Sequence, residues 1–473
     1  VDLSGQPILR SVSLSIAPGI VTGLVGESGS GKSMTALAMM RLLPPGAQTS
    51  GRIDFDGRDI LDLSEVELCE MRGNEIGMIF QEPMTSLNPV FTVERQLTEG
   101  LMIHKEMTKK EAEARALELL KQVRIPEPER RLKQYPHELS GGMRQRVVIA
   151  MALACEPKLL IADEPTTALD VTIQAEILAL MDRLKRETGT AVMFITHDMA
   201  VVAQMADRVV VMFRGNKVEE GTVEEIFENP QHPYTQALLA AVPKLGEMRG
   251  KAAPEPMKLL GRDQGAIAPI PGTGDTLLEV RGLTTRFPVK GGFFRRLVAN
   301  VHAVEDVSFT INKGQTLSLV GESGCGKSSA GRSILRLVEP MAGEIVLDGK
   351  DVMALNDRDL RDARRDMQMI FQDPFASLNP QMQLADQVAE PMHNFGMFPG
   401  SERQERVAML FDRVELPRSF RRRFPHELSG GQRQRVAIAR HLGPNPKRIH
   451  GDEAGSALGC SAQAPGRKRM LEL

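Results

Sequence analysis

Two glycine-rich segments have the residue types and the spacing of a loop that binds phosphate groups. Residues 26–33 read GESGSGKS, and residues 321–328 read GESGCGKS. In such a loop the glycines let backbone N–H groups approach phosphate oxygens, and the N-terminus of the following helix adds positive potential. The two lysines, Lys32 and Lys327, would neutralise the β- and γ-phosphates of a nucleotide. The sequence therefore predicts two nucleotide sites.

Acidic residues that could complete this chemistry follow the same point in each half of the chain. Asp163 and Glu164 come after the apolar run LLIA, and Asp452 and Glu453 take the matching positions later on. We expect Asp163 to hold Mg²⁺ through water and Glu164 to orient or deprotonate the attacking water. His197 ends the next apolar run and could contact the γ-phosphate. The loop serines expected to bind Mg²⁺ are Ser33 and Ser328.

The elements that must position these groups alternate between strands and helices. The apolar runs 21–25, 159–162 and 191–195 are typical of buried parallel strands, and the first of them leads into the first loop. Residues 109–122 and 173–187 have helical periodicity. Each half is therefore predicted to be α/β, with its phosphate loop following a buried strand.

The chain consists of two copies of one unit, because three segments of the first half, residues 26–33, 79–89 and 135–146, recur in the same order at residues 321–328, 370–380 and 424–435. We predict a first domain at residues 1–243, a linker rich in proline and glycine at residues 244–276, and a second domain at residues 277–473. We expect the first domain to lack its start and the second to be truncated after its acidic pair.

The composition is that of an ordinary globular protein. Of 473 residues, 42% are hydrophobic and 25% charged, which excludes collagen-like and long disordered chains. Lys+Arg (59) nearly balances Asp+Glu (61), so we expect no nucleic-acid partner. No run of about 18 apolar residues occurs, so we expect that the chain does not span a bilayer by itself. The four cysteines are too widely spaced for a zinc or disulfide framework and fit a reducing cytoplasm.

A Ser-Gly-Gly segment in each copy completes a set of motifs that resembles the ATP-binding subunits of ABC transporters. The resemblance covers essentially the whole chain. It implies two tandem P-loop NTPase domains of the ABC ATPase type, each with a helical subdomain that carries the Ser-Gly-Gly signature. It also implies that two domains hold two ATP molecules head to tail. Each nucleotide would touch the loop of one domain and the signature of the other.

The same resemblance assigns roles residue by residue. The implied catalytic residues are Glu164, His197, Gln81 and Glu453. The implied metal ligands are Ser33, Gln81, Asp163, Ser328, Gln372 and Asp452. The implied ATP contacts are Gly26, Glu27, Ser28, Gly29, Ser30, Gly31, Lys32, Ser33, Ser140, Gly141, Gly142, Asp170, Gly321, Glu322, Ser323, Gly324, Cys325, Gly326, Lys327, Ser328, Gln372, Ser429, Gly430, Gly431 and Gln432.

Two longer stretches, residues 80–89 and 230–243, are similar to the dipeptide, oligopeptide and nickel importer group. Among its fused tandem forms, the chain is most similar to ATP-binding subunits of glutathione importers. This resemblance implies ATP and Mg²⁺ as cofactors, two transmembrane permease subunits, and a periplasmic or extracellular substrate-binding protein. It places the chain on the cytoplasmic side of the inner membrane, held there by its partners.

The second copy departs from the pattern near its end. Residues 448–451 read RIHG where the first copy has LLIA, and a buried strand would not readily accept Arg and His without partners. Residues 456–459 read SALG, without the Asp that Asp170 supplies, and the position matching His197 lies beyond Leu473. We expect the second site to be impaired and hydrolysis to come from the first. A misread or decayed coding sequence would explain this tail.

Three other functions remain open: a nickel or other solute importer ATPase of the same group, a soluble tandem ATPase that acts on ribosomes, and a decayed nucleotide-binding fragment. A DNA-repair ATPase of the same superfamily is disfavoured, because it would need zinc-binding cysteines and the four cysteines are too widely spaced for such a site.

The family stacks adenine on an aromatic residue before the loop, and Phe287 is the candidate in the second copy.

Overall fold

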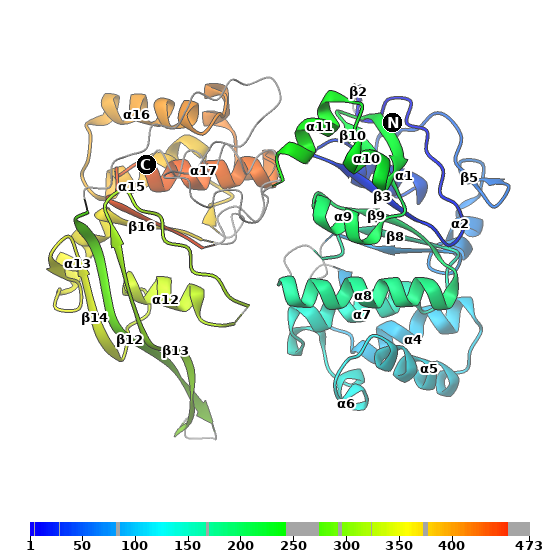
Figure 1. The fold of residues 1–473 in the computed structure, drawn as a ribbon, viewed down its shortest axis with the longest axis horizontal. Helices are drawn as coiled ribbons and strands as arrows, with labels where there is room; N and C mark the ends of the chain where they lie inside the picture. The colour runs from blue at the N-terminus through cyan, green and yellow to red at the C-terminus, as the bar shows by residue number, and fades with distance from the viewer. Residues whose placement is uncertain are drawn as a thin grey trace. The chain divides into compact units, whose positions relative to one another are not determined.

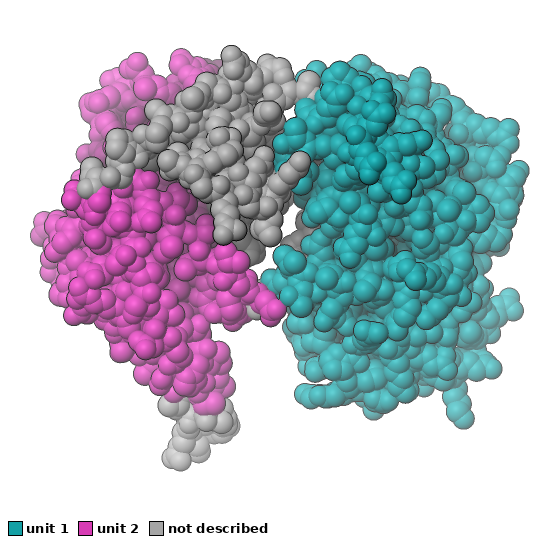
Figure 2. Space-filling view, in the orientation of Figure 1, with its two compact units in different colours: residues 1–244, 258–262 teal, residues 245–257, 263–473 magenta. Residues whose placement is uncertain are grey.

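The computed structural model describes residues 1–3, 5–27, 29–81, 86–166, 170–242, 274–291, 296–322, 324–371 and 377–452. The chain divides into two compact units (Figure 2). Unit 1 comprises Val1–Lys244 and Lys258–Arg262, and unit 2 comprises Leu245–Met257 and Asp263–Leu473.

Unit 1 is built around a six-stranded sheet in the order β11-β10-β3-β9-β8-β7 (Figure 1). Five strands are parallel, and β11 runs antiparallel to β10. Their bounds are β3 (Val21–Gly26), β7 (Ile76–Ile79), β8 (Leu159–Asp163), β9 (Ala191–Ile195), β10 (Arg208–Phe213) and β11 (Asn216–Thr222). The three strands expected from the apolar runs are confirmed. Each brings its carboxyl end to one edge of the sheet, where the predicted catalytic groups follow.

Helices cover both faces of this sheet, because alternate residues of each central strand point to opposite sides. Leu160 and Phe194 enter one core with the larger group of helices, whereas Ile161 and Met193 enter the other with α1 and α2. The helices of the first core are α4 (Val93–His104), α5 (Lys109–Gln122), α7 (Gly141–Leu153) and α8 (Val171–Thr188). Those of the second are α1 (Lys32–Met39) and α2 (Glu65–Met71). The shorter helices are α6 (Pro128–Leu132), α9 (Met199–Met205), α10 (Val223–Glu228) and α11 (Pro233–Ala240).

Local sequence explains where these helices begin. The helix predicted over 109–122 is α5, and Thr108 caps it while Glu111 bonds back to the Thr108 backbone. The helix predicted over 173–187 is α8, which ends at the left-handed Gly189. Short strands complete unit 1: β1 (Asp2–Leu3), β2 (Gln6–Pro7), β4 (Ala47–Gln48), β5 (Asp54–Phe55) and β6 (Arg58–Asp59). They form a three-stranded sheet, β2-β1-β4, and a hairpin, β5-β6.

Unit 2 repeats the helical layer but only part of the sheet. Its helices are α12 (Lys327–Ile334), α13 (Asp357–Asp366), α15 (Leu384–Asn394), α16 (Gly400–Arg413) and α17 (Gly430–Leu442). Its strands are β12 (Thr276–Gly291), β13 (Arg296–Asn312), β14 (Ala342–Leu347), β15 (Lys350–Asp351), β16 (Met367–Ile370) and β17 (Arg448–Gly451). The first four form an antiparallel sheet in the order β13-β12-β14-β15, and β16 pairs with β17 in parallel, as β7 does with β8.

The strand expected before the second phosphate loop does not form, and that prediction is wrong for unit 2. In unit 1 the matching strand, β3, lies between β9 and β10. Among the described residues of unit 2, no strand pairs with the segment 315–320, and its Val320 is 91% exposed. An apolar run needs neighbours to satisfy its backbone groups and cover its side chains, so here the segment stays irregular.

This difference predicts a contrast in amide hydrogen exchange. Amides of β3 should be strongly protected, because both neighbouring strands bond to it and all six of its residues are buried. Amides of residues 315–320 should exchange near the rate of an unstructured chain. Mass spectrometry of peptides covering the two segments would measure this contrast, and equal protection of both would contradict it.

The strand β17 does form from the unusual residues Arg448, which is buried, and His450, which is half-buried, but each has a buried side-chain nitrogen without a partner among the described residues. Arg448 is 9% exposed, and its Nη1 has no partner among the described residues; burial lowers its pKa to about 10. His450 Nε2 also has no partner in the described part of the chain, and burial lowers the pKa of this imidazole. Arg448 Nη1 and His450 Nε2 thus lack the partners that a buried strand requires, although the strand itself forms.

Candidate active site

The first phosphate loop connects β3 to α1, and two of its glycines are required by geometry. Gly26 has φ 150° and Gly31 has φ 103°, in the region that favours glycine. A Cβ on Gly26 would collide with the carbonyl oxygen of Met212 at the end of β10. The loop is therefore pressed against the neighbouring strand, and its position is fixed by the sheet.

Lys32 is held inside this loop. Its side chain is 6% exposed, and Nζ donates to the carbonyl oxygens of Gly26 and Glu27, each at 2.9 Å. A lysine tethered to backbone carbonyls is ready to exchange them for the stronger acceptors of a phosphate group. The predicted role of Lys32 fits this position.

Oxygen ligands suitable for Mg²⁺ meet at the end of β8. Asp163 is 4% exposed, the Ser33 side chain bonds to its carboxylate, and its Oδ1 has no partner among the described residues. Burial raises the pKa of Asp163 to about 6. A buried carboxylate with an unpaired oxygen is stabilised by a cation, and Mg²⁺ prefers such ligands. The residues present therefore fit the ion.

Glu164 is the centre of a cluster drawn from three strands. His197 Nδ1 lies 3.0 Å from Glu164 Oε1, and Gln81 Nε2 donates to Glu164 Oε2 at 3.2 Å. Glu164 follows β8, His197 follows β9, and Gln81 follows β7. The hydrogen bond with Glu164 raises the pKa of His197, against the opposing effect of burial. The structure thus brings together three residues that are 33 to 116 positions apart in sequence, as predicted.

The second loop keeps the local contacts of the first. Lys327 Nζ donates to the carbonyl oxygens of Gly321 at 2.7 Å and Glu322 at 2.8 Å, and Ser328 Oγ donates to Asp452 Oδ1 at 2.8 Å. Val320 and Gly321 are exposed, whereas the matching residues of unit 1, Val25 and Gly26, are buried. The lysine and serine contacts of the second loop are thus made, but no strand in the described part of unit 2 supports its start.

The signature segments lie at helix N-termini in both units. Ser140 caps α7 by accepting a bond from Met143 N, and Ser429 caps α17 by accepting one from Gln432 N, both at 3.4 Å. Gly141 and Gly142, and likewise Gly430 and Gly431, form the first turns of these helices. In unit 1 the signature helix packs on the face of the sheet opposite α1.

Two further predicted residues, Asp170 and Phe287, lie in described parts of the chain. Asp170 is the first residue before α8 and makes no capping bond with its side chain. Phe287 lies in β12 opposite Val301 and is 38% exposed. The predicted residues outside the described ones are Ser28, Ser323, Gln372 and Glu453, together with the segment 456–459.

A positioning residue that the sequence reasoning missed is Gln145 in α7. It is 1% exposed, and its Nε2 donates to the carbonyl oxygen of Pro165 at 2.5 Å. Because Pro165 directly follows Glu164, this bond ties the signature helix to the segment that carries Glu164. The signal was available: Gln145 recurs as Gln434 at the same place in the second copy.

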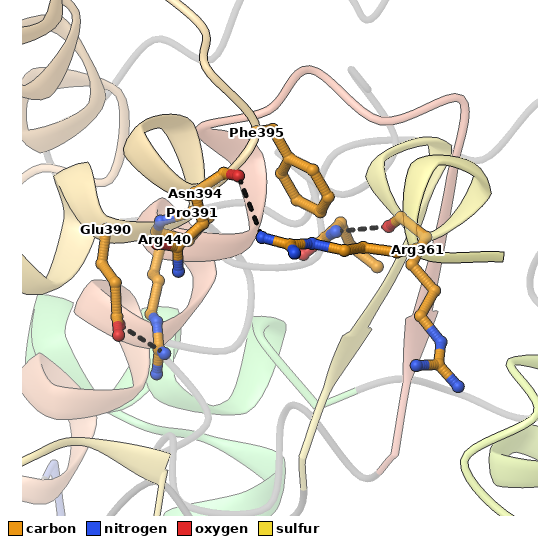
Figure 3. Close-up of a pocket in the computed structure, with 8 residues that line it drawn as sticks. Arg361, Glu390, Pro391, Asn394, Phe395 and Arg440 are labelled. Atoms are coloured by element: carbon orange, nitrogen blue, oxygen red, sulfur yellow. Dashed lines mark hydrogen bonds and ion pairs between the residues drawn. The ribbon is translucent and has the colours of Figure 1, made fainter. Parts of the chain in front are cut away.

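A cavity of about 300 Å³ lies in unit 2, and none of the residues that line it is a predicted ATP contact (Figure 3). Its most prominent charged pair is Arg440 and Glu390, which bond at 2.8 Å, while Arg440 also donates to Ser377 O at 2.8 Å. Arg361 donates to Asn394 O at 3.4 Å. These arginines therefore serve contacts within unit 2.

Within the described ranges, none of the helices is long and apolar enough to cross a bilayer.

Comparison with known proteins identifies the same motifs. The family described as "ABC transporter" matches residues 9–167 and 304–456, and "Oligopeptide/dipeptide transporter, C-terminal region" matches residues 218–265. The chain is 52% identical to the glutathione import ATP-binding protein GsiA of Escherichia coli O157:H7, over 98% of this chain and 77% of that protein. It is 51% identical to GsiA of Escherichia coli strain K12 over the same shares. A solved structure of the ATP-binding cassette MJ0796 bound to ADP and Pi is 34% identical, with a TM-score of 0.42, over 46% of this chain and 90% of that one.

Proposed function

This chain belongs to the ABC transporter family, and from that membership we propose that it is the ATP-hydrolysing subunit that drives an importer of glutathione or of di- and oligopeptides. The observation that carries the proposal is the cluster of Glu164, His197 and Gln81 beside a phosphate loop whose lysine is already tethered. A carboxylate held by two neighbours at the ends of parallel strands is well placed to accept a proton from water.

The chemistry of the first site follows from its own residues. Backbone N–H groups of the loop and Lys32 would bind the β- and γ-phosphates, and Ser33 with Asp163 would hold Mg²⁺. Bound Mg²⁺ would neutralise charge on the phosphate oxygens. Glu164 would orient the attacking water and take its proton, while His197, which contacts Glu164, would hold it in place and contact the γ-phosphate. Gln81, which follows β7, would contact the metal ion and link the nucleotide site to the membrane partner.

Hydrolysis at the two sites is proposed to be unequal. The second loop has Lys327, Ser328 and Asp452 in place, but its start has no supporting strand among the described residues. A phosphate loop gains affinity from a fixed arrangement of N–H groups, so a loosely held loop binds nucleotide less tightly. Each site would also require a Ser-Gly-Gly signature from another ABC domain, at Ser140–Gly142 or Ser429–Gly431.

The proposed partners follow from the relatives rather than from this chain. Proteins that share the oligopeptide/dipeptide C-terminal region and the GsiA name point to glutathione or short peptides as the transported solute. An import ATPase acts on membrane permease subunits, and we propose that two of them hold this chain at the cytoplasmic face of the inner membrane. A substrate-binding protein on the other side would deliver the solute.

Uptake of radiolabelled glutathione by cells that lack the gene would test this proposal. Cells complemented with the wild-type chain should accumulate the label, whereas cells with Lys32→Ala should remain at the level of the deletion. Excess unlabelled dipeptide or Ni²⁺ would identify the preferred solute by competition. If deletion of the gene leaves uptake of glutathione, dipeptides and Ni²⁺ unchanged, the proposed importer role is wrong.

A further inference from the structure

A tyrosine from the end of unit 1 bonds to the first phosphate loop. The hydroxyl of Tyr234, in α11, accepts a hydrogen bond from the backbone N–H of Glu27 at 2.9 Å, although the two residues are 207 positions apart. Tyr234 lies in the stretch that matches the oligopeptide/dipeptide C-terminal region, residues 218–265. That stretch therefore reaches the nucleotide site directly.

The bond acts on one peptide group of the loop. The peptide between Gly26 and Glu27 has its carbonyl oxygen held by Lys32 Nζ at 2.9 Å, and its N–H held by Tyr234. When Lys32 moves to a phosphate, the carbonyl contact is lost, but the N–H contact can persist. Tyr234 then keeps this peptide from rotating.

Tyr234 is itself firmly placed. It is 4% exposed, and its ring lies 4.2 Å from that of Phe213, centroid to centroid, at the end of β10. Its own N–H donates to His232 Nδ1 at 3.1 Å. The Glu219 carboxylate accepts bonds from the backbone N–H groups of Gln231 at 2.7 Å and His232 at 3.1 Å.

The opposite side of the same peptide meets β10, where the Met212 carbonyl lies so close that Gly26 cannot carry a Cβ. The start of the loop is therefore enclosed by the end of β10 and by α11. Packing of the ring does not require a hydroxyl, whereas satisfying the N–H of Glu27 does.

We infer that Tyr234 is a positioning residue of the first nucleotide site, which holds the Gly26–Glu27 peptide in the orientation that binds nucleotide. The inference rests on the proposed nucleotide site in unit 1. Without the hydroxyl, the peptide samples other orientations in the free protein, and nucleotide binding has to restore the productive one. The loss therefore falls on affinity for ATP and not on the hydrolysis step.

The test uses Tyr234→Phe in a full chain that carries Lys327→Ala, so that binding reports the first loop. We expect the Kd for a fluorescent ATP analogue and the KM for ATP to rise about three- to tenfold, with kcat at saturating ATP unchanged. The sequence contains two tyrosines, and Tyr135→Phe is the matched control, expected to leave both constants unchanged.

A second measurement separates positioning from general weakening of the fold. Hydrogen exchange of the peptide that contains Glu27 should accelerate in Tyr234→Phe, while exchange in α12 should not change. Unchanged affinity together with unchanged exchange, or a lower kcat at unchanged KM, would overturn the inference. Failure of the Lys327→Ala parent to bind the analogue would instead overturn the proposed site in unit 1.

Discussion

Replacing Glu164 by Gln should lower ATP turnover by a factor of about 10² to 10⁴, because the amide cannot accept the proton of the attacking water. Binding of ATP should stay close to that of the wild type, since Lys32 and the loop are untouched. Gln has the same shape as Glu and can still bond to Gln81 and His197, so the cluster should keep its geometry. Phosphate release at saturating ATP measures turnover, and fluorescence titration with an ATP analogue measures binding.

The control for this variant is a carboxylate of unit 1 outside the site. Glu156 forms an exposed ion pair with Arg115 at 2.7 Å, and Glu156→Gln should leave turnover unchanged because exposed ion pairs contribute little. If Glu164→Gln retained turnover within a factor of about three, a loss far smaller than removal of a general base causes, Glu164 would not activate the water.

In unit 2 a glycine lies directly against the half-buried ring of His450. A methyl group on Gly331, in α12, would overlap the ring of His450, in β17. The matching residues of unit 1 are Ala36 and Ile161, both fully buried in one core. Gly331→Ala alone should destabilise unit 2 by about 1–3 kcal/mol, because the core is overpacked.

Combining Gly331→Ala with His450→Ile should increase the free energy of unfolding of unit 2, whereas Gly331→Ala alone should lower it. The double variant recreates the pairing of unit 1 and removes a buried Nε2 that has no partner in the described part of the chain. Such a group costs about 1–3 kcal/mol, so the double variant should be more stable than the parent.

The two substitutions form a cycle in which the interaction energy between neighbours can be measured directly. Urea unfolding of each variant, monitored by hydrogen exchange in peptides from α12 and β17, gives the free energy of unfolding of unit 2. Gly400→Ala serves as the control, since nothing lies within 4 Å of a Cβ added there. A Gly331→Ala variant as stable as its parent would contradict the close contact with His450.

The first site could be predicted from the sequence because its residues follow from local patterns. The phosphate loop has a fixed spacing, and Asp163, Glu164 and His197 each end an apolar run that becomes a parallel strand. Parallel strands place their carboxyl ends at one edge, so the meeting of these groups follows from the fold.

The remaining features depend on partners that are distant in sequence. The segment 315–320 looks like β3 but has no paired neighbours among the described residues, and a local pattern cannot show that. The role of Tyr234 depends on where α11 folds back, because its partner, Glu27, lies 207 positions earlier. The close contact of Gly331 with His450 required the register of β17.

The central claim is that ATP hydrolysis comes from the site in unit 1. The most direct test compares steady-state phosphate release by Glu164→Gln and Glu453→Gln chains, prepared and assayed side by side with saturating ATP and Mg²⁺. Glu164→Gln should remove nearly all turnover, whereas Glu453→Gln should retain most of it. Equal losses in the two variants, or a larger loss in Glu453→Gln, would contradict it.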